Sequence, residues 1–551
     1  MESSRTRNSI LDWLISAILA VAAISELAGI DIDVGAFALR SHSAWRLLIV
    51  AAMLVVIRRR LTIESMPLWL TRMTWRIAIC ASIATWLRFL VPTIGGADSY
   101  GYVSASDLIA QGRLIADAPI AAWLSAENRL AIASPLGWAP AVDGAGIVPA
   151  YPIGLPLLMA MFTAIAGSNA VYAVAPVLAV ITLLLVHRLG RAWYDADTAL
   201  LATALVAWNP LFIAYAKQPM SDVPATMWIV LAMVLAVTAK SSTAFAAGIA
   251  AGCAVVTRPA LLLAAMAIVW VAHRGDIARR RAMLCAAGLG VGLIVQMAIQ
   301  NFLFGSPFST GYGATAALFS WSHLDDNLGI FGKQGWFVVG PLWMLGLIIG
   351  IFAARPEPRT KPLLVFAGVV APYLFYLPFD HWETLRYLLP GVVVLTVTVA
   401  AGLMRFSRTP QNATATAIML CAFTGVAVAQ SELLLRRSDV WRIAEIEARY
   451  PLAGDWININ TPPNSVVLAN QHSGSLRWYG KRQTLRWDFI APEQLATTVR
   501  ELESHDAPVY VALEGAEVEM FNARFATVMQ ELQVDPVGRL RNVTFLRLSK
   551  K

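Results

Sequence analysis

An acidic and aromatic cluster, Asp98-Ser99-Tyr100-Gly101-Tyr102, follows directly after an apolar run over residues 76–94. A run of about 20 apolar residues is long enough to cross a bilayer. A carboxylate at the end of such a run is well placed to accept a proton at the membrane surface. Polar and amphipathic chain then continues to Tyr151-Pro152-Ile153-Gly154-Leu155-Pro156 before the next convincing span. The pattern indicates a reaction at the membrane surface, with Asp98 as the first candidate for its general base.

A second carboxylate and three cations lie where other apolar spans are expected to begin or end. Asp222 is the second catalytic candidate, either as a partner of the base or as a group that orients an acceptor. Arg258 and Arg386, the latter followed by Tyr387, carry planar guanidinium groups that suit a phosphate. Lys217 is a weaker third cation. Plainer roles stay open, because acidic residues also cap helices and arginines also anchor helix ends at the membrane interface.

Two groups of polar side chains offer the oxygen and imidazole ligands that several divalent metals accept. They are His323 with Asp325 and Asp326, and Asp380-His381 with Glu383. The ordinary polarity of loops explains both groups as well, so a metal at His323 and Asp325 is one of two open interpretations.

Aromatic residues and glycines also have two interpretations each. Tyr100, Tyr102 and Tyr151 can line a groove for a sugar or lipid, although aromatic belts at membrane interfaces are commoner. The glycines at 288, 290 and 292 lie inside an apolar stretch and indicate close helix packing rather than a nucleotide loop.

The composition defines the class of protein. Of the 551 residues, 58% are hydrophobic and 14% are charged, and the mean hydropathy is +0.61. These values exclude a soluble globular chain. The net charge of +8 comes from Lys and Arg concentrated in alternate short loops, which indicates orientation in a membrane and no nucleic-acid partner. All four cysteines fall in apolar segments, so neither a disulfide framework nor a paired-cysteine metal site is expected.

The basic loops predict the topology, because Lys and Arg collect on the cytoplasmic side of a membrane. They give about 13 transmembrane helices, with the amino terminus inside and the carboxyl terminus outside. The spans lie near 10–30, 44–57, 76–94, 170–187, 197–216, 222–239, 243–257, 259–272, 282–303, 331–353, 362–379, 387–404 and 412–431. Two assignments rest only on the alternation of basic loops between the two sides of the membrane. Residues 153–167 are expected not to cross the membrane, and residues 243–272 are expected to form a hairpin of two spans.

The outer side then collects the loop 95–169 and everything after residue 436. Residues 104–111 and 154–166 are expected as interfacial helices, each with an apolar face. In the tail, alternating apolar residues at 465–469, 508–513 and 543–548 predict strands, and residues 494–502 predict a helix. We therefore predict an all-α polytopic transmembrane domain over residues 1–435 and a small soluble α/β domain, extracytoplasmic or periplasmic, over residues 436–551.

Five sequence elements, all on the expected outer side, occur in an order that resembles a known family. They are Gly96-Ala97-Asp98-Ser99-Tyr100, the Tyr-Pro-x-Gly-Leu-Pro segment at 151–156, Asp222-Val223-Pro224, Thr257-Arg258-Pro259 and Leu385-Arg386-Tyr387-Leu388-Leu389-Pro390. Together they resemble the GT-C superfamily of membrane glycosyltransferases, in the branch that holds protein O-mannosyltransferases and the lipid A aminoarabinose transferase. The resemblance covers most of residues 76–405.

The resemblance implies an inverting hexosyl- or pentosyltransferase that moves a sugar from a polyprenyl-phosphate donor to a hydroxyl acceptor. Asp98 matches the family's catalytic Asp by position, and the cations would hold the leaving phosphate. The chemistry requires no cofactor. Protein mannosyltransferases carry an Asp-Glu pair where this chain has Asp98-Ser99, which favours a glycan or lipid over a protein as acceptor. The expected location is the inner (plasma) membrane, with the site on its extracytoplasmic face.

Two other functions stay open. A lipid-linked glycan flippase or other transporter also has many spans, but it places ionisable residues at the membrane midplane in broken helices. A glycan polymerase or ligase would use a lipid-diphosphate donor instead. The released lipid product separates these classes.

Overall fold

The computed structural model describes residues 10–22, 30–34, 37–41, 47, 49–51, 53–54, 66–238, 240–314, 318–353, 356–407 and 412–551. The chain forms two compact units. The helical unit comprises residues 1–90, 172–295 and 318–441, and the mixed unit comprises residues 91–171, 296–317 and 442–551. The predicted span near 44–57 lies largely outside the described residues.

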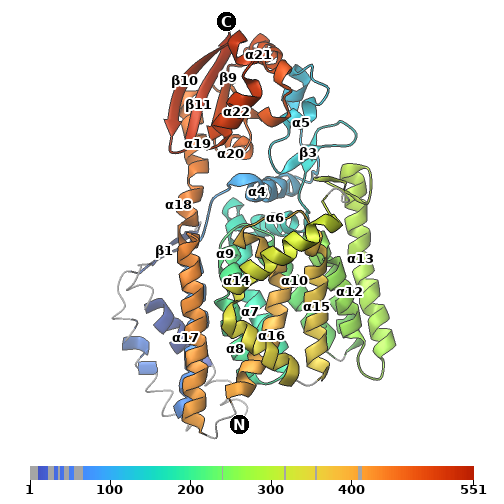
Figure 1. Cartoon of the computed structure of the whole chain (residues 1–551), viewed down its shortest axis with the longest axis vertical. Coiled ribbons are helices and arrows are strands. Elements are labelled where there is room, and N and C mark those ends of the chain that lie inside the picture. The colour runs from blue at the N-terminus through green and yellow to red at the C-terminus, as the bar shows by residue number, and fades with distance from the viewer. Residues whose placement is uncertain are drawn as a thin grey trace. The chain divides into compact units, whose positions relative to one another are not determined.

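The helical unit is built of apolar helices joined by short connections (Figure 1). A helix over Ile10–Ala22 is followed by an antiparallel hairpin of β1 (Ile30–Val34) and β2 (Phe37–Ser41). The other elements are α3 (Met66–Arg88), α7 (Val174–Trp193), α8 (Ala196–Ala207), α9 (Pro210–Ala216), α10 (Asp222–Val237), α11 (Ser241–Thr257), η3 (Pro259–Leu261), α12 (Leu262–Ala272), α13 (Ala278–Phe304, which continues into the mixed unit), η5 (Trp321–His323), α14 (Leu324–Ala353), α15 (Pro356–Leu374), η6 (Trp382–Leu388), α16 (Leu389–Ser407), α17 (Ala413–Arg437) and η7 (Val440–Arg442). Helices suit an apolar surrounding because they satisfy their own backbone groups.

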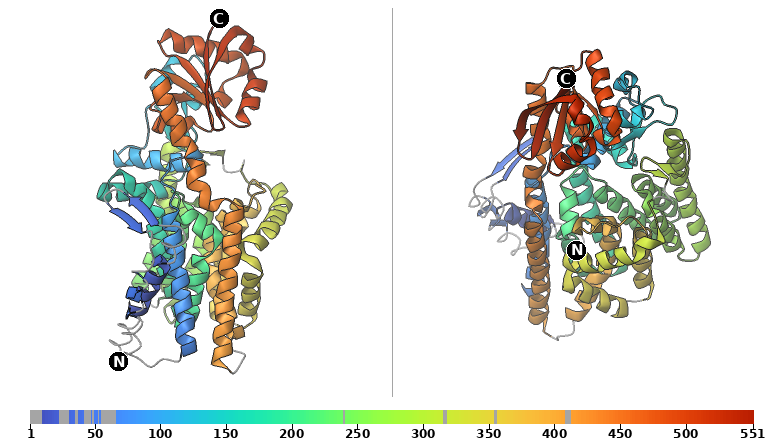
Figure 2. Two further views of the ribbon diagram at one scale, coloured as in Figure 1. Left: turned by 90° about the vertical axis from the view of Figure 1, so that its left-hand side faces the viewer. Right: turned by 45° about the horizontal axis from the view of Figure 1, so that its top comes forward.

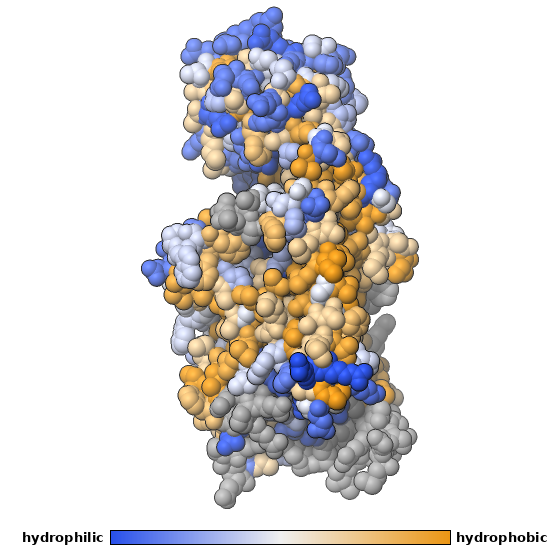
Figure 3. Space-filling model, turned by 90° about the vertical axis from the view of Figure 1, so that its right-hand side faces the viewer, coloured by the Kyte–Doolittle hydropathy of each residue, from blue (hydrophilic) through white to orange (hydrophobic). Residues whose placement is uncertain are grey.

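Burial separates the central helices from the peripheral ones. In the most apolar stretch of Trp382–Ser407, which contains α16, 89% of the residues are buried. In the most apolar stretches of α13 and α17, only 22% of the residues are buried. The exposed side chains of α13 include Met283, Val291 and Ile294, and Figure 3 shows the apolar surface over this part of the chain. Continuous apolar exposure is stable against lipid, so α13 and α17 face the membrane.

Close packing of α11 on α13 depends on glycine. A Cβ added to Gly292 would lie 2.4 Å from Cα of Gly252, and one added to Gly288 would lie 2.4 Å from the carbonyl oxygen of Phe245. A Cβ at Gly290 would meet nothing within 4 Å. Small residues allow membrane helices to approach closely enough for extensive dispersion contacts. The predicted packing role is confirmed for Gly288 and Gly292 and is wrong for Gly290, which faces away from α11.

The helix α3 begins ten residues before the predicted span 76–94. The predicted span left out Arg72 and began at Arg76, and the fold pairs both arginines with carboxylates. Arg72 Nε lies 2.7 Å from Asp197 Oδ1, and Arg76 Nη1 lies 3.0 Å from Asp12 Oδ2. These ion pairs allow charged side chains inside an otherwise apolar helix.

Two helical runs are bent at a break. Helices α8 and α9 meet at 65° across Trp208-Asn209, and the segment Trp321–Trp336, which runs from η5 into α14, meets the segment Val338–Phe352 of α14 at 89°. Pro210 cannot donate a backbone hydrogen bond. The side chain of Asn209 caps the new helix by accepting from the N–H groups of Leu211 at 3.1 Å and Phe212 at 3.2 Å. The predicted span 197–216 is therefore a bent pair rather than one straight helix.

By length and composition, four helices among the described residues can cross a membrane, or six when each bent pair counts as one span. Six shorter apolar helices accompany them. The short helices include Ser241–Thr257 and Pro259–Ala272, the two arms of the predicted hairpin, and Gly154–Ala166, which was predicted not to cross. The fold is that of a polytopic helical membrane protein, and the count of about 13 spans stays a prediction.

The mixed unit combines the first long loop with the carboxyl-terminal tail. Its elements are α4 (Gly96–Ala110), η1 (Pro119–Trp123), α5 (Arg129–Ala133), β3 (Trp138–Pro140), β4 (Ile147–Pro149), α6 (Gly154–Ala166), β5 (Ser309–Thr310), β6 (Gly313–Ala314), α18 (Ile443–Glu447), α19 (Arg449–Asn460), β7 (Val466–Ala469), α20 (Ser473–Trp478), β8 (Gln483–Leu485), α21 (Leu495–Ser504), β9 (Val509–Glu514), α22 (Glu517–Phe525), β10 (Leu532–Leu540) and β11 (Val543–Lys550). The strands and helix expected in the tail are present as β7, β9, β11 and α21.

Five strands form one sheet in the order β10-β11-β9-β7-β8. β7 pairs in parallel with β8 and β9, whereas β9, β11 and β10 pair antiparallel. Side chains alternate between two cores: Leu468 packs with α21 and α22 on one face, and Val467 packs with α19 and α20 on the other. Figure 2 shows these helices on both sides of the sheet. The period-two pattern in the tail therefore reflects a sheet covered on both faces.

The mixed unit is larger than the domain predicted after residue 435. The unit boundary lies between Trp441 and Arg442, and residues 91–171 and 296–317 also belong to it. The physical reason is shared burial. Ile120, Leu124 and Ile132 of the first loop lie in the same core as the sheet residues Val466 and Val509. The tail sequence alone gives no sign of this contribution.

Replacing Gly292 by Ala should destabilise the helical unit, because the new Cβ would meet the backbone of Gly252. Overpacking of this kind costs about 1–3 kcal/mol. Gly290→Ala is the matched control on the same helix, and it should leave stability unchanged or slightly raised, because Ala favours a helix over Gly. Thermal unfolding in detergent measures both. Equal Tm values for the two variants would contradict the packing interpretation.

Candidate active site

Asp98 is the third residue of α4 and lies in its first turn. The N-cap is Gly95, which has an extended backbone and no side-chain cap, so Asp98 does not have the N-cap role that the plainer interpretation gave it. Ser99 serves the helix start instead, because its Oγ accepts from the Gly95 N–H at 2.9 Å and donates to the Gly95 carbonyl. A carboxylate in the first turn is favoured by the helix dipole. The half-buried Asp98 side chain therefore does not serve as the N-cap of α4.

Tyr151 holds the Asp98 carboxylate. Its hydroxyl donates a 2.6 Å hydrogen bond to Asp98 Oδ1. Burial, reinforced by the charge of Asp98, raises the pKa of Tyr151, so the hydroxyl stays protonated and remains a donor. The Tyr151 ring centroid lies 5.0 Å from that of Tyr102 and 5.7 Å from that of Tyr312. The structure thus brings together three predicted residues, Asp98, Tyr102 and Tyr151, within the mixed unit.

Asp222 and Arg258 form a buried ion pair in the helical unit. Asp222 begins α10 and is fully buried, and its Oδ1 accepts from Arg258 Nη2 at 2.7 Å. The same nitrogen donates to Ser221 Oγ at 3.2 Å. Arg258 follows the last residue of α11 because Pro259 disfavours a helical conformation at the preceding position. A carboxylate without exposed surface cannot meet an acceptor hydroxyl, so the geometry favours an orienting role for Asp222, directed at Arg258.

Two arginines lie against one tyrosine. The guanidinium carbon of Arg258 is 5.6 Å from the Tyr387 ring centroid, and that of Arg386 is 5.3 Å from it. Tyr373 stacks on Tyr387 at 4.8 Å with the ring planes 7° apart. Stacking on an aromatic ring orients a guanidinium and leaves its N–H edge for hydrogen bonds. Four predicted residues therefore form one cluster: Asp222 of α10, Arg258 after α11, and Arg386 and Tyr387 of η6.

Lys217 and Tyr100 have other surroundings than predicted. Lys217 is 1% exposed, its ammonium donates to the carbonyl of Val440, and it lies 5.5 Å from the Trp441 ring centroid. Tyr100 is buried against α20, where a Cβ added to Gly474 would lie 2.2 Å from its ring. The structure gives Lys217 a structural hydrogen bond in place of the expected phosphate, and it gives Tyr100 a packing contact in place of a groove position.

The residues considered for a metal do not assemble into a ligand set. Among the described residues, no three His, Cys, Asp or Glu side chains come together as metal ligands would. His323 ends η5, and Asp325 is exposed in the first turn of α14. In the second group, Asp380 Oδ2 lies 3.6 Å from Lys333 Nζ. The described geometry gives the metal interpretation no support.

Sequence reasoning missed three residues of these clusters. Ser221 shares the Arg258 guanidinium with Asp222, Tyr373 stacks on Tyr387, and Tyr312 packs edge-on against Tyr151. Ser221 was visible as the neighbour of Asp222. Tyr312 lies between Gly311 and Gly313 in a turn far along the sequence, and only the fold brings it to Tyr151.

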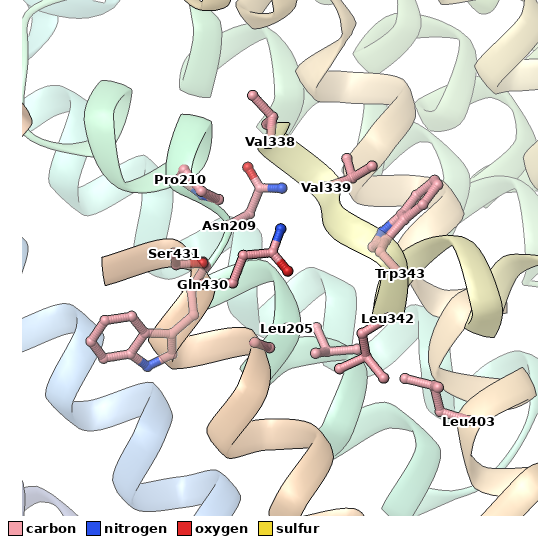
Figure 4. Close-up of a pocket in the computed structure, with 12 residues that line it drawn as sticks. Leu205, Asn209, Pro210, Val338, Val339, Leu342, Trp343, Leu403, Gln430 and Ser431 are labelled. Carbon is pink, nitrogen blue, oxygen red and sulfur yellow. The ribbon is translucent and has the colours of Figure 1, made fainter. Parts of the chain in front are cut away.

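A pocket at the bends of the helical unit contains none of the predicted site residues (Figure 4). It is lined by Leu205, Trp208, Asn209, Pro210, Val338, Val339, Leu342, Trp343, Leu403, Ala427, Gln430 and Ser431. The amide groups of Asn209 and Gln430 point into it. Amides and a hydroxyl supply neither a base nor a cation, so this pocket does not have the groups that sugar transfer needs.

Comparison with protein families matches part of the chain. Residues 150–299 match the family described as Dolichyl-phosphate-mannose-protein mannosyltransferase. This segment contains Tyr151, Asp222 and Arg258. A comparison with curated proteins gives no significant match.

Several solved structures are similar to this chain at low sequence identity. ArnT from Cupriavidus metallidurans bound to undecaprenyl phosphate aligns with a TM-score of 0.53 at 10% identity, over 86% of this chain and 97% of that one. The apo state of the same enzyme gives 0.52 at 12% identity, over the same shares. An oligosaccharyltransferase from Archaeoglobus fulgidus in the apo form gives 0.47 at 12% identity, over 87% of this chain and 74% of that one. The predicted resemblance to the GT-C membrane glycosyltransferases is confirmed, and the chain has their fold.

Proposed function

We propose that this protein is an inverting glycosyltransferase that moves a sugar from a polyprenyl-phosphate donor to a hydroxyl acceptor at the outer face of the membrane. The observation that carries the proposal is the convergence of Arg258 and Arg386 on Tyr387, with Asp222 fixing one of the two cations. Such a cluster suits a phosphate anion. The similarity to an enzyme crystallised with undecaprenyl phosphate supports a polyprenyl-phosphate donor.

Asp98 is the proposed base. The acceptor hydroxyl gives its proton to the carboxylate as its oxygen forms a bond to the anomeric carbon. The bond from that carbon to the phosphate oxygen breaks, and its electron pair leaves with the polyprenyl phosphate. Attack opposite the leaving group inverts the anomeric centre. The hydrogen bond from Tyr151 orients the carboxylate, and the protonated tyrosine adds no competing charge.

The arginines act on the leaving group. Negative charge grows on the phosphate as the bond to the sugar breaks, and pre-oriented cations stabilise this charge most in the transition state. Asp222 keeps the Arg258 guanidinium in place before the donor binds. A stacked, ion-paired guanidinium needs little reorganisation during the reaction. No residue role in this mechanism requires a cofactor.

The acceptor is proposed to be a glycan or lipid rather than a protein, because Ser99 occupies the position of the second acidic residue of protein mannosyltransferases. The hydroxyl of Ser99 bonds the backbone of Gly95. Incubation of the purified protein with a polyprenyl-phosphate sugar and candidate acceptors tests the proposal by the lipid released. Free polyprenyl phosphate supports it, whereas polyprenyl diphosphate would indicate a polymerase or ligase, and transbilayer movement of intact lipid would indicate a flippase.

Asp98→Asn should lower the rate of sugar transfer by about 100-fold or more, the range for loss of a positioned base. The amide keeps the size of the side chain, and the carboxylate makes no N-cap that the change would remove. Asp107→Asn is the matched control, because Asp107 is an exposed carboxylate on the same helix. The kcat at saturating donor measures the effect. Parental kcat for Asp98→Asn would exclude Asp98 as the base.

Arg258→Lys and Arg386→Lys should each weaken donor binding, since Lys keeps the charge but loses the planar, stacked group. A rise in donor KM of about 10-fold matches the loss of a charge-assisted hydrogen bond, worth about 1.5–3 kcal/mol. Arg405→Lys, at an exposed position in the last turn of α16, is the control and should change nothing. The acceptor KM should stay constant throughout. Donor KM values equal to the parent for both variants would exclude these arginines as the phosphate site.

Ser504→Cys, in a background without the four native cysteines, should react with an impermeant thiol reagent added to the outer face of intact cells. Ser504 is exposed at the end of α21, so labelling reports topology rather than burial. The expectation follows from the basic loops. Labelling that requires a breached membrane would reverse the proposed orientation.

A further inference from the structure

The segment that carries Asp98 is held by the carboxyl-terminal part of the mixed unit. Before the helix, the Ile94 N–H donates to the Tyr479 hydroxyl at 2.8 Å. At the helix start, a Cβ added to Gly95 would lie 2.2 Å from both the Tyr450 ring and the Glu447 carboxylate. The backbone of Gly95 therefore touches the Tyr450 side chain with no room for another atom.

The turn at this point has little freedom to adapt. Gly96 has a φ of +59°, a left-handed conformation that side-chain-bearing residues rarely adopt. The Tyr450 hydroxyl and the Gln471 amide are the nearest groups to a Cβ added there, at 3.4 and 3.6 Å. Asp98 follows two residues later, so a displacement of this turn displaces the carboxylate.

Tyr450 is itself fixed from several sides. It is 1% exposed, and its hydroxyl oxygen accepts hydrogen bonds from Gln471 Nε2 at 2.7 Å and from Arg449 Nη2 at 3.1 Å. The guanidinium of Arg449 also lies 4.6 Å from the Tyr450 ring centroid. A buried ring with two charge-assisted or amide donors on its hydroxyl has one well-defined position.

The support continues into the central sheet. Arg449 Nε lies 3.0 Å from Glu514 Oε1, at the end of β9, and another of its nitrogens lies 3.3 Å from Glu447. The second oxygen of Glu514 lies 3.2 Å from Nε2 of the fully buried His472. Strand β9 is thereby connected through Arg449 to Tyr450.

On its other side the first turn of α4 is closed by the first loop. A Cβ added to Gly137 would lie 2.8 Å from the carbonyl oxygen of Ala97, and one added to Gly101 would lie 2.4 Å from the Tyr151 ring. The turn thus lies between Tyr450 and the Gly137–Tyr151 side of the loop. Neither side alone encloses it.

We propose that Tyr450 is a positioning residue for sugar transfer and that the carboxyl-terminal domain serves to hold the Gly95-Gly96 turn so that Asp98 meets the acceptor hydroxyl. The inference rests on the proposed function, because it assigns the effect of Tyr450 to Asp98. It gives the tail domain a role in the chemical step rather than in donor binding. Tyr450 makes no contact with reacting atoms in this scheme.

Tyr450→Ala should lower kcat by about 10- to 100-fold, since a misplacement of about 1 Å has an effect of this size. The donor KM should change less than about 2-fold, because the phosphate cluster belongs to the helical unit. Tyr450→Phe keeps the ring against Gly95 and should recover most of the rate. Hydrogen exchange of the amides in residues 96–102 should be faster in Tyr450→Ala. Leu502→Ala, a change in the core of the same domain, is the control for general destabilisation and should alter neither kcat nor this exchange at temperatures where it is folded.

The combination with Asp98→Asn decides the assignment. If Tyr450 acts through Asp98, Tyr450→Ala should not reduce the residual rate of the Asp98→Asn protein further. An equal fractional loss in both backgrounds, a parental kcat for Tyr450→Ala, or unchanged exchange at residues 96–102 would each overturn the inference. Failure of the proposed function has a different signature, namely a parental rate for Asp98→Asn alone. In that case faster exchange would still support Tyr450 as the group that fixes the turn, and unchanged exchange would refute it.

Discussion

The buried ion pair of Asp222 and Arg258 is the interaction on which the cluster in the helical unit depends. Both partners lie at breaks in the helices, Asp222 at the start of α10 and Arg258 between α11 and η3. The Asp222 side chain is 1% exposed and that of Arg258 is 12% exposed. Removal of one partner of a buried pair leaves an uncompensated charge and costs about 3–5 kcal/mol. The pair therefore fixes how the ends of these helices meet, and it sets where the guanidinium stands against Tyr387.

The same requirement for partners explains how the bent helices persist in an apolar surrounding. Where α8 ends, the carbonyls of Ala207 and Trp208 accept from the hydroxyls of Ser82 on α3 and Ser431 on α17. Buried Arg281 donates to backbone carbonyls at the ends of other helices. Without water, each freed backbone group needs such a partner. Scattered polar residues in the apolar stretches are therefore structural supports, distinct from the residues assigned to catalysis.

The sequence predicted what is periodic or locally encoded. Apolar runs predicted most helices, the break before Pro259 was predicted whereas the bend before Pro210 was not, and alternation predicted the strands β7, β9 and β11. The start of α3 was predicted ten residues too late, because the charge of Arg72 is neutralised by Asp197, far along the chain. The sequence could not show that Ile120 and Ile132 complete the core of the tail domain, because that depends on long-range packing.

The residues of the candidate site also fall into those that could be identified from the sequence and those that could not. Asp98, Asp222, Arg258, Arg386 and Tyr387 were identifiable because each stands at the end of an apolar run beside proline, glycine or aromatic residues. Their neighbours Tyr312, Tyr373 and Tyr450 were not identified, because tyrosine is too common at membrane interfaces to single them out. Lys217 was predicted as a third cation for the phosphate, and in the structure its ammonium donates to the backbone carbonyl of Val440.

Exposure separates the roles of the two carboxylates that the sequence treated alike. A general base must approach the proton it removes, and the Asp222 side chain, which is 1% exposed, is too buried for a hydroxyl to approach. Asp98 retains exposure, and the Tyr151 hydroxyl orients its carboxylate by donating a hydrogen bond. Asp222 is committed to Arg258 by a short, charge-assisted hydrogen bond. The exposure of Asp98 therefore matches the base role proposed for it, and the burial of Asp222 matches the proposed role of orienting the Arg258 guanidinium.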